Sequence, residues 1–335
     1  MLQLPARLGK YELQQFLGGG MSHVYRSTDT LLGRQVAVKI LTAQGVSDPE
    51  SKQRFLQEAR VASNISHQNI ISVYDFGEEA GKPYMVMEYL VGESLRDAMK
   101  NGHTGDLNRK LGYALQLGRA LEHIHSKKII HRDIKPENVH IDGSGKVKLM
   151  DFGIAKSEGL SLTRAGFTLG TPYYMAPEQV LGQQVTTQVD VYSFGVLLYE
   201  MIVGLKPVSG ETVEKIFSAI LYESLNLEPL RAAQVPESVY NLIAACTAKN
   251  PTERPQGFGV VCGELERILN YPTGSGSKSA IKVTSHSSAS GDLPGFMKIL
   301  PSFLQTPTGL IVVFGLGVLV FLTIVGLVAV KFLIK

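Results

Sequence analysis

The stretch that decides the fold lies in the first half of the chain and reads His131-Arg132-Asp133-Ile134-Lys135-Pro136-Glu137-Asn138. A second stretch, Asp151-Phe152-Gly153, begins eighteen residues after Asp133. Together they hold carboxylates, an amide and cations, which are the groups that bind metal ions and phosphates in proteins. We therefore interpret the rest of the chain outward from this pair.

Transfer of a phosphoryl group from ATP needs the residue types that the two stretches supply. It requires a carboxylate that orients the attacking hydroxyl, oxygen ligands for Mg²⁺, and cations that offset the charge of the phosphates, because positioning and electrostatics provide most of the catalysis. A single surface Asp or Lys is usually only solvated, so the prediction depends on the ordered set.

On these residues the chain resembles the protein kinase family, and the resemblance extends from about residue 11 to residue 269. It implies an α+β fold with two lobes. The first, about 11–90, would be a small antiparallel β-sheet lobe with one regulatory helix. The second, about 91–269, would be larger and mainly helical. The resemblance also implies ATP and Mg²⁺ as cofactors, with Mn²⁺ as an alternative ion.

The resemblance implies a role for each residue of the set. Asp133 is expected to act as the catalytic base or positioning carboxylate, and Lys135 to steady the transferring phosphate. Asn138 and Asp151 are expected to bind the metal.

Two upstream residues complete the expected phosphate site. The segment Val36-Ala37-Val38-Lys39 ends a predicted strand, and Glu58 follows Lys39 by nineteen residues on a predicted helix. The resemblance implies an ion pair between Lys39 and Glu58 that holds the lysine against the α- and β-phosphates.

The glycine-rich loop departs from the family pattern G-x-G-x-x-G-x-V. The stretch reads Leu17-Gly18-Gly19-Gly20-Met21-Ser22-His23-Val24. Counting back from Val24 puts Leu17 and Ser22 at the first and third glycines, whereas counting from Gly18 puts His23 at the third. Either way the loop is one residue short, which lowers the expected nucleotide affinity. Three adjacent glycines could also form only a flexible turn.

An adenine pocket is implied around the segment 83–90, which reads as a strand leading into the hinge between the lobes. Met87 is expected to be the gatekeeper, and the backbones of Glu88 and Leu90 are expected to face adenine. Val24 and Ala37 would pack on the ring. These apolar residues could equally belong to an ordinary core, so the assignment depends on their position relative to Lys39 and Asp133.

The substrate class is implied by Lys135 and by the segment 170–178, which resemble serine/threonine rather than tyrosine kinases. Thr171 is expected to bridge Asp133 and Lys135. Two further contacts are expected to be structural: Glu178 with Arg254, and Asp190 with the backbone of the catalytic loop.

Arg132 beside Asp133 suggests control by phosphorylation of the loop between Asp151 and Glu178, because an anion would neutralise a cluster of cations there. Thr163 and Thr168 are the first candidates, with Ser157 and Ser161 after them. Autophosphorylation in trans would involve a homodimer.

Two other interpretations start from the same residues. A pseudokinase, a membrane-tethered binding module without the reaction, fits the short glycine loop, but the complete set of expected catalytic residues favours an enzyme. A small-molecule phosphotransferase of kinase-like fold is disfavoured by the segment 170–178, which shapes a peptide-docking surface.

Composition limits the partners and the compartment. The net charge of +3, from 33 basic and 30 acidic residues, predicts no nucleic-acid partner. Cys246 and Cys262 are the only cysteines, lack metal-ligand spacing and are too few for a disulfide framework, which fits a reducing compartment.

Periodicity gives a coarse secondary structure. Residues 13–17, 24–28 and 35–41 read as strands, while 49–65 and 107–125 carry apolar residues at helical spacing. We expect the folded domain to begin near Tyr11.

The C-terminal part is predicted to reach the membrane. Residues 270–308 read as a flexible juxtamembrane linker, because Ser, Gly, Thr and Lys replace the apolar pattern there. From Gly309 to Val330, 22 residues include Thr323 as the only clearly polar side chain, and about 1.5 Å per residue gives about 33 Å. The sequence predicts a transmembrane helix, 309–330, a short tail, 331–335, and a kinase domain at the cytoplasmic face of the inner membrane.

Overall fold

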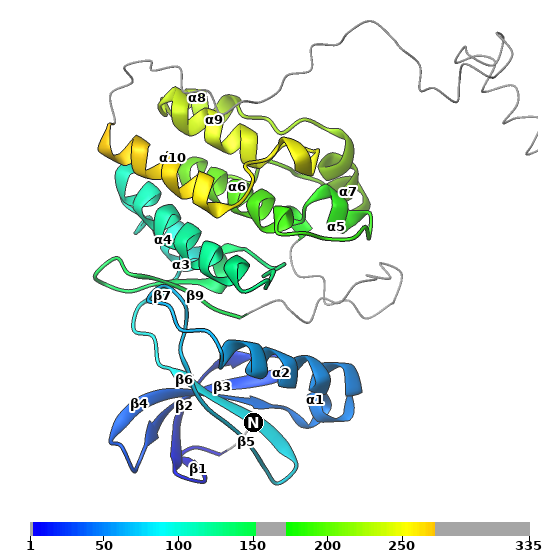
Figure 1. Ribbon diagram of the computed structural model, residues 1–335. Coiled ribbons are helices and arrows are strands. Elements are labelled where there is room, and N and C mark those ends of the chain that lie inside the picture. The colour runs from blue at the N-terminus through cyan, green and yellow to red at the C-terminus, as the bar shows by residue number, and fades with distance from the viewer. Residues whose placement is uncertain (1–2, 152–171, 272–335) are drawn as a thin grey trace, which may run out of the picture. The chain divides into compact units, whose positions relative to one another are not determined.

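The structure is a computed structural model that describes residues 3–151 and 172–271. These residues belong to one compact unit, Met1–Ala280, and form a sheet lobe and a helical lobe (Figure 1). No helix in these two ranges is long and apolar enough to cross a membrane. Thr171, the four candidate phosphorylation sites, most of the linker, the segment 309–330 that the sequence predicts to be a transmembrane helix, and the tail lie outside the described residues.

The sheet lobe is one antiparallel sheet of six strands within residues 3–151, in the order β1-β2-β3-β4-β6-β5. The three predicted strands are present and longer than expected. The strands are β1 Ala6–Leu8, β2 Tyr11–Gly19, β3 Ser22–Asp29, β4 Arg34–Leu41, β5 Val73–Glu79 and β6 Lys82–Glu88. The first strand, β1, begins five residues before the expected start near Tyr11, and it pairs Leu8 with Tyr11. A strand of three residues is too short to show a period in the sequence.

One face of this sheet carries the core of the lobe. Leu13, Tyr25, Val36, Val38 and Val86 are buried together, because alternate residues of a strand point to the same face. The face that meets the helices buries Leu41 and Met85 against Phe55 and Ala59.

The lobe contains two helices in its described residues, so the expectation of a single helix is wrong. The long helix α2, Pro49–Ala62, begins at the N-cap Asp48, whose carboxylate accepts from the Ser51 backbone N–H at 3.1 Å. The short helix α1, Ala43–Ser47, begins at the N-cap Thr42. Five residues give too little apolar periodicity to predict α1 from sequence.

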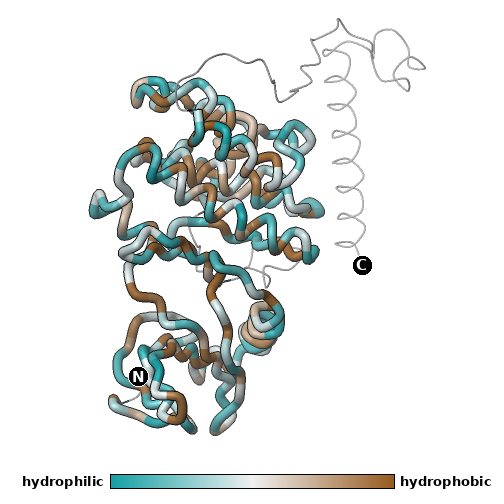
Figure 2. Tube along the Cα trace, turned by 60° about the vertical axis from the view of Figure 1, so that its left-hand side comes forward, coloured by the Kyte–Doolittle hydropathy of each residue, from teal (hydrophilic) through white to brown (hydrophobic). Residues whose placement is uncertain are grey.

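The helical lobe is built around α6, Gln188–Val203, which is buried along nearly its whole length. The predicted helix 107–125 is observed as α4, Leu107–Ser126. Hydrophobic residues recur along these helices (Figure 2). The other helices are α3 Leu95–Lys100, α5 Pro177–Val180, α7 Val213–Tyr222, α8 Glu228–Ala232, α9 Glu237–Cys246 and α10 Phe258–Asn270. Cys246 and Cys262 are free and buried in this lobe, and burial raises the pKa of each thiol to about 12.

A small sheet that the sequence did not predict lies beside the helices. It has the order β7-β8-β9, with β7 Glu93–Ser94, β8 Val139–Ile141 and β9 Val147–Leu149. The stretch 131–138 runs from α4 into β8, and Asp151 follows β9. This sheet therefore brings the end of the stretch 131–138 close to Asp151, and the Met150 backbone N–H donates to the Asn138 carbonyl at 2.9 Å.

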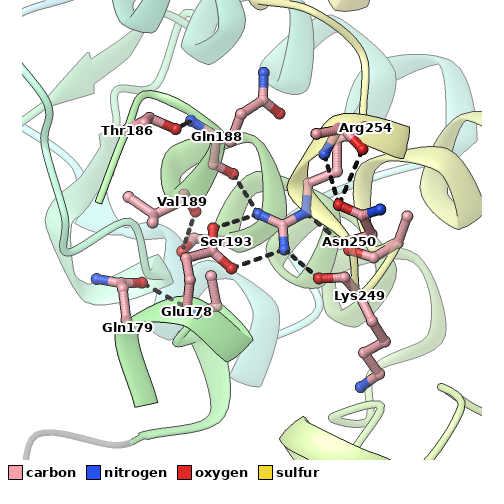
Figure 3. A network of polar contacts seen from close by, with 12 residues as sticks. Glu178, Gln179, Thr186, Gln188, Val189, Ser193, Lys249, Asn250 and Arg254 are labelled. Carbon is pink, nitrogen blue, oxygen red and sulfur yellow. Dashed lines mark hydrogen bonds and ion pairs between the residues drawn. The ribbon is translucent and has the colours of Figure 1, made fainter. Parts of the chain in front are cut away.

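A buried ion pair joins α5 to the segment before α10 (Figure 3). Arg254 Nη1 and Nη2 donate to the Glu178 carboxylate at 2.6 and 2.9 Å, as the sequence predicted. The same guanidinium donates to the backbone carbonyls of Gln188 and Lys249 at 2.9 and 3.0 Å.

Candidate active site

A cavity of about 400 Å³ is lined by residues of both lobes. Eight of the expected nucleotide-binding residues line it, namely Leu17, Gly18, Val24, Ala37, Glu58, Met87, Glu88 and Leu90. Gly19, Gly20 and Lys39 are not among its lining residues, whereas Asp151 is. A largely apolar cavity of this size with a few polar groups suits a small-molecule ligand.

The glycine stretch forms the hairpin between β2 and β3. Gly18 pairs with Val24 and Gly19 with His23, after an irregularity between Phe16 and Gly18. Gly19 has a φ of +133°, and a Cβ there would lie 1.9 Å from the Ser22 carbonyl oxygen. The turn is therefore so tight that this position requires glycine.

Hydrogen bonds from Thr42 also hold the turn in place. The Met21 carbonyl accepts hydrogen bonds from the Thr42 backbone N–H and from Thr42 Oγ1, each at 2.9 Å. Since Thr42 caps α1, the unpredicted short helix holds the tip of the hairpin.

The segment that joins the lobes carries the expected hinge residues. Met87 is buried and pairs with Ala37 across β4 and β6. The Glu88 side chain accepts from Lys148 Nζ at 2.7 Å and from the Ser72 backbone N–H at 3.3 Å. Sequence reasoning missed Lys148, because a lysine in a short strand carries no motif.

Lys39, Glu58 and Asp151 meet beside the cavity, which Glu58 and Asp151 line. Lys39 Nζ lies 2.8 Å from Glu58 Oε1 and 3.0 Å from Asp151 Oδ1. The predicted ion pair between β4 and α2 is present, and it extends to the residue that follows β9. One lysine thus joins three elements from two lobes.

The charges of this cluster stabilise one another. Burial opposes the charge of Lys39, but Asp151 and Glu58 outweigh it and raise the pKa of the lysine. Lys39 is the main cause of the lowered pKa of Asp151, whereas burial raises the pKa of Glu58. Lys39 is therefore cationic and Asp151 anionic at neutral pH.

The catalytic loop holds Asp133 between a cation and an amide. Asp133 Oδ2 lies 2.8 Å from Lys135 Nζ and accepts from Asn138 Nδ2 at 3.0 Å. Asn138 Nδ2 also donates to the Asp133 backbone carbonyl at 2.8 Å. Because the amide nitrogen is engaged in this way, the amide oxygen of Asn138 is the atom left for a ligand.

The donor set fits a hard divalent cation. Asn138 offers an amide oxygen and Asp151 an ionised carboxylate, and oxygen ligands of this kind suit Mg²⁺, which keeps several waters and binds phosphate oxygens. Within residues 3–151 and 172–271, no three His, Cys, Asp or Glu side chains gather as ligands of a metal held by protein alone.

Asp190 holds the backbone of the catalytic loop. Its carboxylate accepts from the backbone N–H groups of His131 and Arg132, each at 2.8 Å. It also contacts His125 Nε2 at 2.7 Å. The predicted brace is present, and Arg132 has a φ of +65° within it.

Comparison with known proteins identifies this arrangement. A family model of the protein kinase domain matches residues 11–267. The chain belongs to the protein kinase family.

Bacterial relatives share this kinase domain. A probable serine/threonine-protein kinase of Streptomyces coelicolor is 37% identical over 282 residues, which is 80% of this chain and 41% of that protein. Serine/threonine-protein kinase PrkC of Bacillus subtilis is 38% identical over 73% of this chain and 38% of its own length. Serine/threonine-protein kinase PknA of Mycobacterium tuberculosis is 38% identical over 75% of this chain and 59% of its own length. The chain thus spans about two fifths to three fifths of these relatives.

The kinase domain also contains an arginine that sequence reasoning missed. Arg96, on α3, donates through Nε to Glu137 and through Nη1 to Glu200, each at 2.8 Å. Its Nη2 donates to the Tyr174 hydroxyl at 2.5 Å, and Tyr174 also donates to Glu200. The network joins the catalytic loop to the turn at 172–174. A lone arginine outside any motif gives no signal in one sequence.

Proposed function

We propose that this protein is a serine/threonine protein kinase that transfers the γ-phosphate of ATP to serine or threonine residues of proteins. The observation that supports it most is the double contact of Lys39 with Glu58 and Asp151. Glu58 and Asp151 line a cavity of suitable size, in a domain that also contains the Asp133–Lys135–Asn138 loop. Family membership supports the reaction class.

Each side chain of the site has its own role in the proposed reaction. ATP bound with Mg²⁺ supplies the phosphoryl group, and Mn²⁺ is an alternative ion. Asn138 and Asp151 hold the metal, while Lys39 binds the α- and β-phosphates. Asp133 orients the acceptor hydroxyl and takes its proton, and Lys135 offsets charge on the transferred group.

Protein substrates are favoured over small molecules. The segment Pro172–Pro177 is packed on α6 through Ser193, whose hydroxyl donates to the Tyr174 carbonyl at 2.6 Å. The segment is thereby held in place beside the catalytic loop, with Tyr173 and Met175 partly exposed. The relatives' names support serine and threonine as acceptors.

The test is label transfer from ATP by the full chain to itself and to a generic acceptor protein. We expect Asp133→Asn to reduce the rate by about 10²–10⁴-fold, the usual contribution of a positioned base. Lys39→Met should also abolish most transfer. Lys52→Met, in an exposed pair with Glu78 at 3.8 Å, and Asp106→Asn at the N-cap of α4 are matched controls. Absence of transfer by the wild-type chain would favour the pseudokinase. The short glycine loop is the feature of the sequence that fits this alternative.

We further propose that residues 309–330 anchor the chain in the inner membrane, with 270–308 as a linker and the kinase domain in the cytoplasm. The support is the length and apolarity of the sequence segment. Cells that make the full chain should retain it in membranes after an alkaline wash, and a variant without 309–335 should be released. Release of the full chain by the wash would contradict the anchor.

Activation is proposed to occur by autophosphorylation at Thr163 or Thr168, in trans within a homodimer. Mass spectrometry of the active chain should find phosphate on one of them. Label on an Asp133→Asn chain mixed with wild type would establish transfer in trans. Full activity of the double Thr→Ala variant with an unmodified loop would contradict the proposal.

A further inference from the structure

The strand β9 carries a buried lysine and pairs with β8, the strand that follows the catalytic loop. Lys148 is 8% exposed. Its Nζ donates to Glu88 Oε2 at 2.7 Å and to the Ile70 carbonyl at 3.3 Å. A buried ammonium needs such partners, because desolvation without them is costly. None of the roles assigned above to the reaction uses this lysine.

Glu88 is the last residue of β6 and lies directly before the segment 89–90 that lines the cavity. Its carboxylate is occupied by Lys148 and by the Ser72 backbone N–H. Its backbone N–H donates to the Ser72 carbonyl at 2.8 Å. The position of this cavity wall is thus set by contacts of Glu88 with two other segments.

The segment 69–72 is itself fixed to β9. Leu149 N–H donates to the Asn69 carbonyl at 2.8 Å, and Ile71 N–H donates to the Leu149 carbonyl at 3.0 Å. Asn69 Nδ2 also donates to the Val147 carbonyl at 2.9 Å. The Lys148 side chain therefore closes a ring that runs from β9 through 69–72 to Glu88 and back.

We propose that Lys148 is a positioning residue of the nucleotide site, which holds the hinge wall at Glu88–Leu90 in place for the ring of the bound nucleotide. It is not among the residues that line the cavity, and it acts through the Glu88 carboxylate. The inference rests on the proposed nucleotide site. Loss of the pair would free the end of β6 and would weaken recognition of the ring, while leaving the phosphate side at Lys39 and Asp151 unchanged.

The test compares three ligands on the full chain by calorimetry: Mg–ADP, adenosine, and Mg–triphosphate without a nucleoside. We expect Lys148→Met to weaken Mg–ADP and adenosine binding about tenfold, equivalent to about 1.4 kcal/mol, and to leave Mg–triphosphate binding within a factor of two. Glu88→Gln should have the same pattern. The double variant should lose no more than either single variant, because both act through one pair.

Two variants and one further measurement separate this role from a loss of folding. Lys146→Met removes an exposed lysine two residues away in the same hairpin and should bind all three ligands normally. Lys148→Arg keeps the charge and should recover part of the ADP affinity. Melting temperatures show whether Lys148→Met is folded. If it is not, the binding of the three ligands by Glu88→Gln alone tests the positioning role.

The outcomes are distinct. Equal loss for all three ligands, or no loss for ADP, overturns the role of Lys148 and leaves the kinase function standing. A wild-type chain that binds neither Mg–ADP nor Mg–triphosphate overturns the nucleotide site together with the inference.

Discussion

Arg254 and Glu178 form a buried two-point ion pair across 76 residues of sequence, with nitrogen–oxygen distances of 2.6 and 2.9 Å. The Arg254 side chain is 0% exposed and that of Glu178 is 7% exposed. The remaining guanidinium hydrogens go to the carbonyls of Ala248, Lys249 and Gln188. The arginine thus joins the end of the segment 172–178 to α6 and to the segment before α10.

Removal of one partner should be far more damaging than removal of an exposed pair. Glu178→Ala leaves a buried, uncompensated guanidinium, so we expect a loss of about 3–5 kcal/mol in the free energy of unfolding. Glu211→Ala breaks the exposed pair with Lys215 and should change it by less than about 0.5 kcal/mol. Urea denaturation of the full chain measures both. Similar losses for the two variants would show that the buried pair is not a major support.

Arg96 should tolerate lysine poorly. Lysine has one nitrogen, whereas the Arg96 fork reaches Glu137, Glu200 and Tyr174 from three nitrogens. We expect Arg96→Lys to lower stability by about 1–3 kcal/mol, because a buried carboxylate loses a charged hydrogen bond, and Arg96→Ala to cost more. The KM for a peptide substrate should rise more than the KM for ATP, because the network joins the turn at 172–174, beside which we propose that protein substrates bind, to the catalytic loop. Arg119→Lys, at an exposed pair with Glu266, is the control; equal effects there would contradict the role.

The sequence predicted those parts of the fold that carry a period or a motif. The helix at 107–126 has apolar residues at helical spacing, and the contacts of Lys39 with Glu58 and of Arg254 with Glu178 follow from residues at family spacing. The helix α1 and the small sheet β7-β8-β9 were missed because two to five residues show no period. Lys148 and Arg96 were missed because neither belongs to a motif, and only the folded chain brings them to partners that lie 41 to 104 residues away.

Partly buried histidines should make the kinase domain less stable in mild acid. Burial lowers the pKa of His67, and the nearby His123 lowers it further; burial also lowers the pKa of His140. A histidine with a lowered pKa in the folded state binds its proton more readily when unfolded. Stability is therefore complete above the ordinary value of 6.5 and is lost as pH falls below it.

The measurement is the urea midpoint between pH 7.5 and pH 5.5. Each histidine that stays neutral contributes at most about 1.4 kcal/mol per pH unit, and less for His67, which is only partly buried. We expect His67→Asn to reduce the pH slope, because it removes one member of the pair stacked at 5.1 Å. Gln68→Ala, an exposed neighbour of His67 that carries no titratable group, should leave the slope unchanged. An identical slope in His67→Asn and wild type would exclude His67 as a source.

The glycine turn offers a matched pair of substitutions. Gly19 has a φ of +133° and a Cβ there would meet the Ser22 carbonyl at 1.9 Å, whereas a Cβ at Gly20 would meet nothing within 4 Å. Gly19→Ala must therefore rearrange the hairpin, at a cost of about 1–2 kcal/mol or more from the backbone conformation alone, while Gly20→Ala should be accommodated. We expect Gly19→Ala to weaken Mg–ADP binding about tenfold and Gly20→Ala to change it less than threefold, both measured by calorimetry. If both variants bind like wild type, the tight turn has no part in nucleotide binding, and the short loop would be only a connection between β2 and β3.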